Sequence, residues 1–461
     1  MRYPTTLKED PWEDGIRDIW EGEALKHWKS LGYFNDERTI ALHFSTDGVQ
    51  LFRNSTQEAW PFLVLNLNLP PDERYPPFLF SLTCTRYKAD NFLPFGLCPG
   101  PSQPKDLDTF LIPFIDELKL LQTGVPAYDA LSRQTFLLKA HLILVTGDTP
   151  GVSKLFHLSG HNAKHPCRAC KLEGTPYVNH YKTKKGQERQ ITTHYYPPRP
   201  PAVTLQRNGA IRLHVSKFIR RTAQNYQADG QASAGDPQEA TRTGVKGISP
   251  LVLLETVHFP ISVPFDVMHL VYLGFVRDLC RLLSRTFFKT GPLNEHQGGM
   301  SEKEWQQLGV DMAKIGSPKD WGRYPRNIEK HIKGFKAEEL SNFLVHYLLP
   351  LTFNRVNTST YKALQRLVLA MSLATSLELK HSEIGEIEKH LTLFVEWFYD
   401  TYYQQNPQRL PVCKYTVHAL LHLVRDIRMW GSASYFWQFP EVQVFKTGCA
   451  NLSRSDCVAF W

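Results

Sequence analysis

Two aspartates, Asp47 and Asp148, each come directly after a run of apolar and β-branched residues. The first run covers residues 38–46, and the second covers residues 134–147 before the turn at Pro150-Gly151. Apolar runs bounded by turn residues are typical of strands, and the second predicts a strand buried on both faces. A carboxylate at the end of such a strand is placed to bind a cation; the alternative is a turn aspartate that caps the next segment. Two such strand ends predict a shared Mg²⁺ (or Mn²⁺) site, which in phosphodiester chemistry activates the attacking oxygen and stabilises the leaving one.

Two closely spaced cysteines indicate a second kind of metal site. Cys167-Arg-Ala-Cys170 has the spacing with which two thiolates close on one Zn²⁺, and a tetrahedral structural site needs two further ligands. Histidines lie on both sides of the pair, and we expect His180 and His194 to complete a zinc knuckle. The alternative is two incidental buried thiols.

Two further histidine patterns precede or lie on predicted helices. In Asp266-Val-Met-His269, the i and i+3 side chains share one face near a helix start, so His269 could donate a proton or hydrogen bond to a scissile phosphate. An N-terminal cap with a neighbouring histidine is an equally good interpretation of Asp266. His418-x-x-x-His422 also aligns two imidazoles, which two metal ligands would explain, although packing histidines are the simpler interpretation.

Composition limits the class of protein. The chain has 461 residues, 53.0 kDa, 42% hydrophobic residues and a formal net charge of +8, which is globular and compatible with a polyanionic partner. We find no secretory signal and no uninterrupted apolar stretch long enough for a membrane span. Eight cysteines with one tight pair favour a soluble protein of a reducing compartment.

The periodicity of the apolar residues changes along the chain and divides it into five parts. Residues 1–35 form an N-terminal helical segment, and 36–160 form an α/β layer with strands at 39–45, 49–53, 60–67, 78–85 and 137–145 and a helix at 106–121. Residues 161–250 contain the Cys pair and a basic, flexible loop, with 224–246 read as mobile. Residues 251–430 are mainly helical, with 3–4 spacing at 252–255, 267–285, 337–349, 361–379 and 384–403. Residues 431–461 return to the α/β layer.

The order of these motifs resembles the transposases of the CACTA (En/Spm) superfamily of cut-and-paste DNA transposons, especially the fungal branch. The resemblance covers about residues 35–445 and is carried by Ser45-Thr-Asp47-Gly48, 106–121, Gly147-Asp148-Thr-Pro, Gly160-His-Asn-Ala-Lys-His-Pro-Cys167-Arg-Ala-Cys170, Asp266-Val-Met-His269, Gly334-Phe-Lys, Trp430-Gly431 and Trp437-Gln-Phe-Pro440.

The resemblance implies an RNase H-like core, a mixed sheet with flanking helices, interrupted by a zinc-knuckle loop and a large α-helical insertion. It implies a DDE triad, with Asp47 and Asp148 as the first two carboxylates and with Asp266 and His269 beside them. The family pattern puts the third carboxylate two residues after the proline of Phe-Pro, which is Val442 here; Glu441 stands one residue earlier, a rotation of about 100° on a helix.

The ends of the chain also depart from the family pattern. The chain stops at Trp461, 20 residues after Glu441 (461 minus 441), and no DNA-recognition module precedes the core, so we expect a truncated copy. The expected function is metal-dependent cleavage and strand transfer of transposon-end DNA in the nucleus, by a chain able to form homo-oligomers. The alternative is a non-catalytic, transposon-derived remnant that binds nucleic acid or protein. An unrelated zinc hydrolase is a weaker option, because no His-Glu-x-x-His is present.

Overall fold

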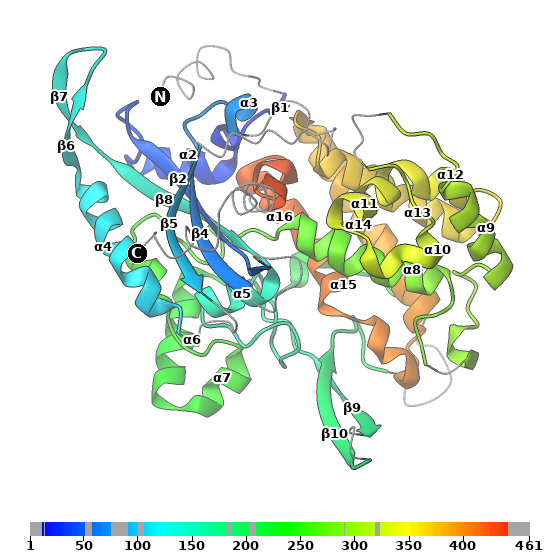
Figure 1. Cartoon of the computed structure of the whole chain (residues 1–461). Coiled ribbons are helices and arrows are strands. Elements are labelled where there is room, and N and C mark those ends of the chain that lie inside the picture. Colours follow the sequence, from blue (N-terminus) through cyan, green and yellow to red (C-terminus); the bar gives the residue numbers. More distant parts are fainter. Residues whose placement is uncertain are drawn as a thin grey trace.

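The computed structural model describes residue 12 and residues 14–50, 58–74, 91–99, 106–182, 186–201, 209–289, 291–318 and 323–440. A mixed β-sheet with its covering helices lies on one side of the molecule, and a large group of helices lies on the other (Figure 1). The fold is therefore mixed α/β. The strand expected at 78–85 and the carboxylate Glu441 lie outside the described residues.

The sheet has five strands among the described residues, and two neighbours at one end of its strand order run parallel. Its order is β3 (Val49–Gln50), β4 (Glu58–Asn66), β2 (Ile40–Thr46) and β8 (Ala140–Gly147), with β5 (Phe92–Pro99) also paired to β4. β4 is antiparallel to both β2 and β5, whereas β2 and β8 are parallel. Every residue of β8 is buried, which confirms the strand buried on both faces that its continuous apolar run predicts.

One helix and one hairpin make the connection that allows β8 to lie parallel to β2. α4 (Asp108–Thr123) follows β5, and the exposed hairpin β6 (Val125–Asp129) and β7 (Gln134–Leu138) comes next (Figure 1). A parallel pair requires such a crossover, because a tight turn joins only antiparallel strands. α4 buries Leu111, Phe114, Ile115 and Leu118 at helical spacing, as its sequence predicts.

The two faces of the sheet belong to different hydrophobic clusters. On one face, Phe44 and Phe62 pack with Phe95 and Phe114, whose rings stack with centroids 3.9 Å apart. On the other face, the cluster continues without a break into the helical part of the chain. There α2 (Glu23–Ser30) packs on α16 (Leu423–Trp430), with the rings of Trp28 and Trp430 5.6 Å apart. The sheet is thus held directly against the helices that precede the end of the described chain.

The helical part contains the helices that the 3–4 spacing predicts, several of them interrupted by π-helical turns. The α-helices are α8 (Arg277–Leu283), α9 (Glu302–Met312), α10 (Ile328–His331), α11 (Ala337–Asn342), α12 (Leu348–Thr352), α13 (Thr358–Ala374), α14 (His381–Phe398), α15 (Tyr415–Ala419) and α16; π-helical segments are Met268–Val276, Phe343–Tyr347 and Tyr399–Tyr403. Short 3₁₀ turns include Pro250–Leu253, Pro407–Val412 and Leu420–His422. A two-residue bridge, β1 (Gly15–Ile16) to β11 (Leu379–Lys380), ties the N-terminal segment to this part.

The prediction of a mobile loop at 224–246 is wrong. That stretch forms α6 (Ala223–Gly235) and α7 (Pro237–Thr243). Thr222 and Asn225 make a reciprocal capping box at the start of α6, and Tyr226 is fully buried against Phe259, with ring centroids 4.3 Å apart. The prediction rested on the low count of large apolar residues in this stretch. That count is a poor guide here, because helix caps and one buried tyrosine are enough to order a short helix on an existing core.

Candidate active site and metal centre

Asp47 and Asp148 leave neighbouring strands at the same edge of the sheet. β2 and β8 are parallel, and the last residues of their ladder, Thr46 and Gly147, are directly paired. An aspartate follows each of these two strand-end residues, so the backbones of Asp47 and Asp148 leave the sheet next to each other. Asp148 is also the N-cap of α5 (Thr149–Leu155), because its Oδ1 accepts the Gly151 N–H at 2.6 Å. Asp148 is therefore a helix cap and a member of the acidic pair at once, so the two interpretations of this residue do not exclude each other.

The environment of this pair disfavours two separate negative charges. Burial raises the pKa of Asp148, and the negative charge of Asp47 raises it further, against the opposing effect of the Gly151 hydrogen bond. Both side chains remain partly accessible. Two adjacent carboxylates with this electrostatic cost are suited to a divalent cation, which would relieve their repulsion.

His269 and Asp266 join the acidic pair at the beginning of a π-helical segment. The Nδ1–H of His269 donates to Asp266 Oδ2 at 2.6 Å, and its Nε2 lies 3.5 Å from Asp47 Oδ2. Burial opposes the charged imidazole, but the hydrogen bonds to Asp266 and Asp47 hold the pKa of His269 well above its usual value. These contacts favour the protonated form of His269, whose Nε2 is directed at Asp47. Asp266 also caps the segment, since it accepts the N–H groups of Met268 and His269 at 3.1 and 3.0 Å.

Gln438 is a member of the site that the sequence did not identify as functional. Its backbone N–H donates to Asp266 Oδ1 at 2.9 Å, and its Nε2 donates to Ser45 Oγ at 3.0 Å and to the Thr46 carbonyl at 3.3 Å. The side chain is fully buried. Gln438 thus fastens the C-terminal part of the described chain to the strand that delivers Asp47. Glu441, three residues later, lies outside the described residues, so its place as third carboxylate stays a prediction.

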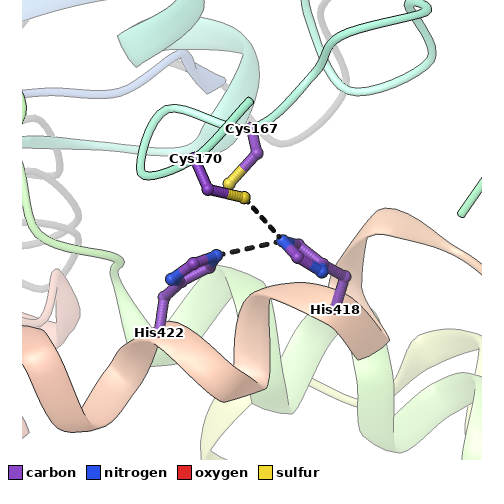
Figure 2. Close-up of side chains that lie close together, drawn as sticks. All are labelled: Cys167, Cys170, His418 and His422. Atoms are coloured by element: carbon purple, nitrogen blue, oxygen red, sulfur yellow. Dashed lines mark hydrogen bonds between the residues drawn. The ribbon is translucent and has the colours of Figure 1, made fainter. Parts of the chain in front are cut away.

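A second cluster gathers Cys167, Cys170, His418 and His422, all buried, with one ligand atom from each within 4.8 Å of all the others. Figure 2 shows the two thiols above the two imidazoles of the helical segment, with the ring nitrogens turned towards the sulfurs. Cys170 Sγ lies 3.3 Å from His418 Nε2, and the Nε2 atoms of the two histidines lie 3.0 Å apart.

The cluster approximates a tetrahedral zinc site, with the two histidine nitrogens, 3.0 Å apart, slightly closer than in an ideal one and the widest pair within 4.8 Å. With Zn–S bonds of about 2.3 Å and Zn–N bonds of about 2.0–2.1 Å, ligand atoms in a tetrahedron lie about 3.3–3.8 Å apart. Burial would raise the pKa of the Cys167 thiol, but Cys170 and the two histidines bring it well below its usual value, while burial lowers the pKa of His418. Zinc binds thiolates and neutral imidazoles, so the lowered pKa values of Cys167 and His418 both favour the forms that bind metal. The cluster could bind a metal such as zinc.

The histidines of this cluster differ from the two that sequence analysis selected. His180 lies exposed on β9 (Thr175–Lys182) and His194 lies on β10 (Glu188–Tyr195), an antiparallel hairpin that projects from the body (Figure 1). Their place is taken by His418 and His422, a pair predicted to be mainly packing residues. Proximity along the chain favoured the hairpin histidines, whereas the fold brings the helical pair to the thiols across 248 positions from Cys170 to His418.

Two arginines of the basic region support the metal centre instead of lying free on the surface. Arg221 is 4% exposed, and its guanidinium donates to the carbonyls of Cys167 and Thr243. Arg168 is 3% exposed and donates to the Pro264 carbonyl at 2.7 Å. Neither is available to follow a phosphate backbone, so the surface charge is smaller than the sequence count suggests.

Part of the chain matches a known protein family. Residues 17–187 match the family described as "Transposase family tnp2". This stretch, a little over a third of the chain, contains Asp47, Asp148 and both cysteines of the metal cluster, but neither Asp266 nor the two histidines. A search of curated proteins found no match. No helix among the described residues is long and apolar enough to cross a membrane. The match to tnp2, which includes both strand-end aspartates, supports a transposase family for this chain.

Proposed function

We propose that the chain is the catalytic region of a DDE-type DNA transposase of the CACTA (En/Spm) kind, which cleaves and joins DNA with Mg²⁺ or Mn²⁺. The observation that carries the proposal is the placement of Asp47 and Asp148 on paired ends of the parallel strands β2 and β8. An antiparallel meander β2–β4–β5, followed by a helix and a strand parallel to the first, also agrees with the RNase H-like core that the resemblance implies.

Each residue of the site has a role in this proposal. Asp47 and Asp148 hold the metal ions, which supply an activated attacking oxygen and stabilise the leaving one. Gln438 fixes the chain beside them, and Glu441, three residues later in the sequence, is the residue that we propose as the third carboxylate.

His269 acts on the substrate side. Its imidazolium, oriented by Asp266, donates a hydrogen bond towards Asp47 in the absence of metal and to a non-bridging phosphate oxygen when DNA is bound. The Asp266 carboxylate is a positioning group rather than a metal ligand, because four hydrogen bonds from Met268, His269 and Gln438 already occupy its two oxygens. In this proposal the Cys₂His₂ cluster holds a structural zinc, the DNA is that of transposon ends, and the protein acts in the nucleus as a homo-oligomer.

The test is metal-dependent nicking of duplex DNA by the purified protein. We expect Mg²⁺ or Mn²⁺ to support nicking and both Asp148→Ala and the near-isosteric Asp148→Asn to abolish it. Asp236→Asn is the matched control, because Asp236 also caps a helix, at Gln238 of α7, but lies far from the acidic pair in the fold. The wild type and the control should nick alike.

Two outcomes would count against the proposal. If the folded wild-type protein with its cluster metal nicks no faster than Asp148→Asn, the chain is the non-catalytic remnant that binds nucleic acid or protein. If Asp236→Asn is as inactive as Asp148→Asn, the effect is one of helix capping. Glu441→Gln then separates a two-carboxylate from a three-carboxylate site: it should abolish nicking as Asp148→Asn does.

A further inference from the structure

One cavity of the described structure is lined by residues of neither site and lies in the helical part of the chain. Its volume is about 710 Å³, within the range of small-molecule sites. The loop around His296, the first turn of α13 and the last turns of α14 form its walls, and the segment 211–213 closes one side. We call it the Trp397 pocket, after the half-buried indole that forms part of its wall.

Two buried polar groups of this pocket have no hydrogen-bond partner among the described residues. His296 is 5% exposed, and neither of its ring nitrogens has a partner; the hydroxyl of Thr360, 1% exposed, has none either. Burial and the nearby Arg409 and Arg285 lower the pKa of His296 to about 4, so the ring is neutral and offers one donor and one acceptor. Buried polar groups are normally paired, and both side chains line the pocket, so a ligand there is a candidate partner for them.

The charged groups of the pocket are mostly committed to the protein. Glu396 Oε1 accepts the Leu213 N–H at 2.8 Å and its other oxygen lies 3.8 Å from the Arg212 guanidinium, while Asp400 accepts the Ile211 N–H at 3.0 Å. These contacts leave neither a cluster of free carboxylates for a metal ion nor a concentration of free cations for a phosphate. What remains for a ligand is the Trp397 indole, neutral donors and acceptors, and the charged side chains of Arg366 and Glu295 on the wall.

We propose that the Trp397 pocket binds one unpaired nucleobase of a DNA strand. A planar, uncharged heterocycle with hydrogen-bonding edges matches the Trp397 ring, the neutral His296 and the Thr360 hydroxyl, and Arg366 is placed to meet the attached phosphate. The inference rests on the proposed function only in taking DNA as the substrate. It adds a base-binding site that the acidic pair neither contains nor requires.

The experiment compares two fluorescently labelled single-stranded 12-mers, one of thymidine and one of abasic sites with the same phosphates, in buffer without added divalent cations. Wild-type protein should bind the thymidine strand about tenfold more tightly, since stacking of one base on an aromatic side chain corresponds to about 5- to 150-fold in affinity. Trp397→Leu should remove most of this preference. Thr360→Val, nearly isosteric and safer for folding, should reduce it by a few-fold without moving the melting temperature appreciably.

Tyr128→Leu is the matched control, because Tyr128 is an aromatic residue 66% exposed on β6. It should keep the full preference. Equal binding of both strands by the wild type would overturn the proposal and leave the pocket to water, as would an unchanged preference in Trp397→Leu and Thr360→Val. Failure of the proposed function would look different: no Asp148-dependent nicking, with the Trp397-dependent base preference intact.

Discussion

Replacing Cys170 with serine should remove the cluster metal and lower the stability of the whole protein. Cys170 is the thiol that lies against His418, and it belongs to a segment 248 positions away from that histidine along the chain. With a metal bound, the Cys₂His₂ cluster of Cys167, Cys170, His418 and His422 would therefore act as a cross-link between the end of the α/β part and the last helices. Its loss frees the denatured chain and removes a bond from the native one.

The size of the effect follows from the length of the closed loop. In the chain-entropy treatment of a cross-link, closing a loop of 248 residues is worth about 5 kcal/mol at 25 °C. The unfolding entropy of 461 residues is about 1 kcal/mol per kelvin, at about 2.1 cal/mol/K per residue. Cooperative unfolding of the whole chain then predicts a fall of about 5 °C in the melting temperature. Unfolding of only the cross-linked part would have a smaller entropy and give a larger fall.

The assay combines the zinc content of protein grown in zinc-supplemented medium with thermal melts, with and without a chelator. Wild-type protein should contain one zinc per chain and lose about 5 °C on chelation; Cys170→Ser should contain none and ignore the chelator. Cys280→Ser is the control, because Cys280 is equally buried, at 1% exposed, and lies outside the cluster. It should keep its zinc. Metal-free wild-type protein whose melting temperature is unchanged by chelation would refute the reasoning, and so would zinc loss in both variants.

Two further predictions concern single side chains. His269 has a pKa well above its usual value of about 6.5, so its contribution to stability is full below that pH and is lost as the pH rises through the folded-state pKa. His269→Asn should therefore destabilise the protein most at about pH 6 and progressively less towards about pH 9, in melts without divalent cations; a difference that does not change with pH would contradict this sign. Tyr226 donates to the Phe156 carbonyl and accepts the Ser249 N–H, both at 3.0 Å, so Tyr226→Phe should cost about 1–3 kcal/mol. Amide exchange in α6 should then be faster than in wild type, and equally fast exchange in both proteins would restore the mobile-loop interpretation.

The acidic pair could be predicted from the sequence because each half of it is local. A strand, a glycine or threonine, and an aspartate are all encoded within a few positions, at Asp47 and again at Asp148. The sequence alone does not show that the two strands are neighbours and run parallel. The structure shows this, because Thr46 pairs with Gly147 in the parallel ladder of β2 and β8. The role of Gln438 could not be predicted from the sequence, because it does not depend on neighbouring residues in the chain. Gln438 belongs to the Trp437-Gln-Phe-Pro440 motif, but its role depends on contacts with Asp266 and Ser45, 172 and 393 positions away.

The Cys₂His₂ cluster could also be predicted only in part, because its members come from distant parts of the sequence. The Cys-x-x-Cys spacing predicted two ligands correctly placed together, but the other two come from a helical pair whose i, i+4 spacing suits packing and coordination alike. His180 and His194 were closer in sequence, and β9 and β10 carry them outwards instead. The helices α6 and α7 were missed although their signals were local: Thr222 with Asn225, and Asp236 before Pro237, are both start signals for a helix.

Pro264 and Phe265, which directly precede Asp266, connect the Cys₂His₂ cluster to the acidic pair. Arg168, between the two cysteines, donates to the Pro264 carbonyl and lies 4.1 Å over the ring of Phe265. A member of the cluster also contacts this ring, since His422 stacks on Phe265 with ring centroids 5.9 Å apart. Asp266 follows immediately and orients His269. Because this path is short and buried, loss of zinc should disturb His269 as well as the fold, and a variant that keeps zinc but loses the Arg168 contact, such as Arg168→Met, should separate the two effects.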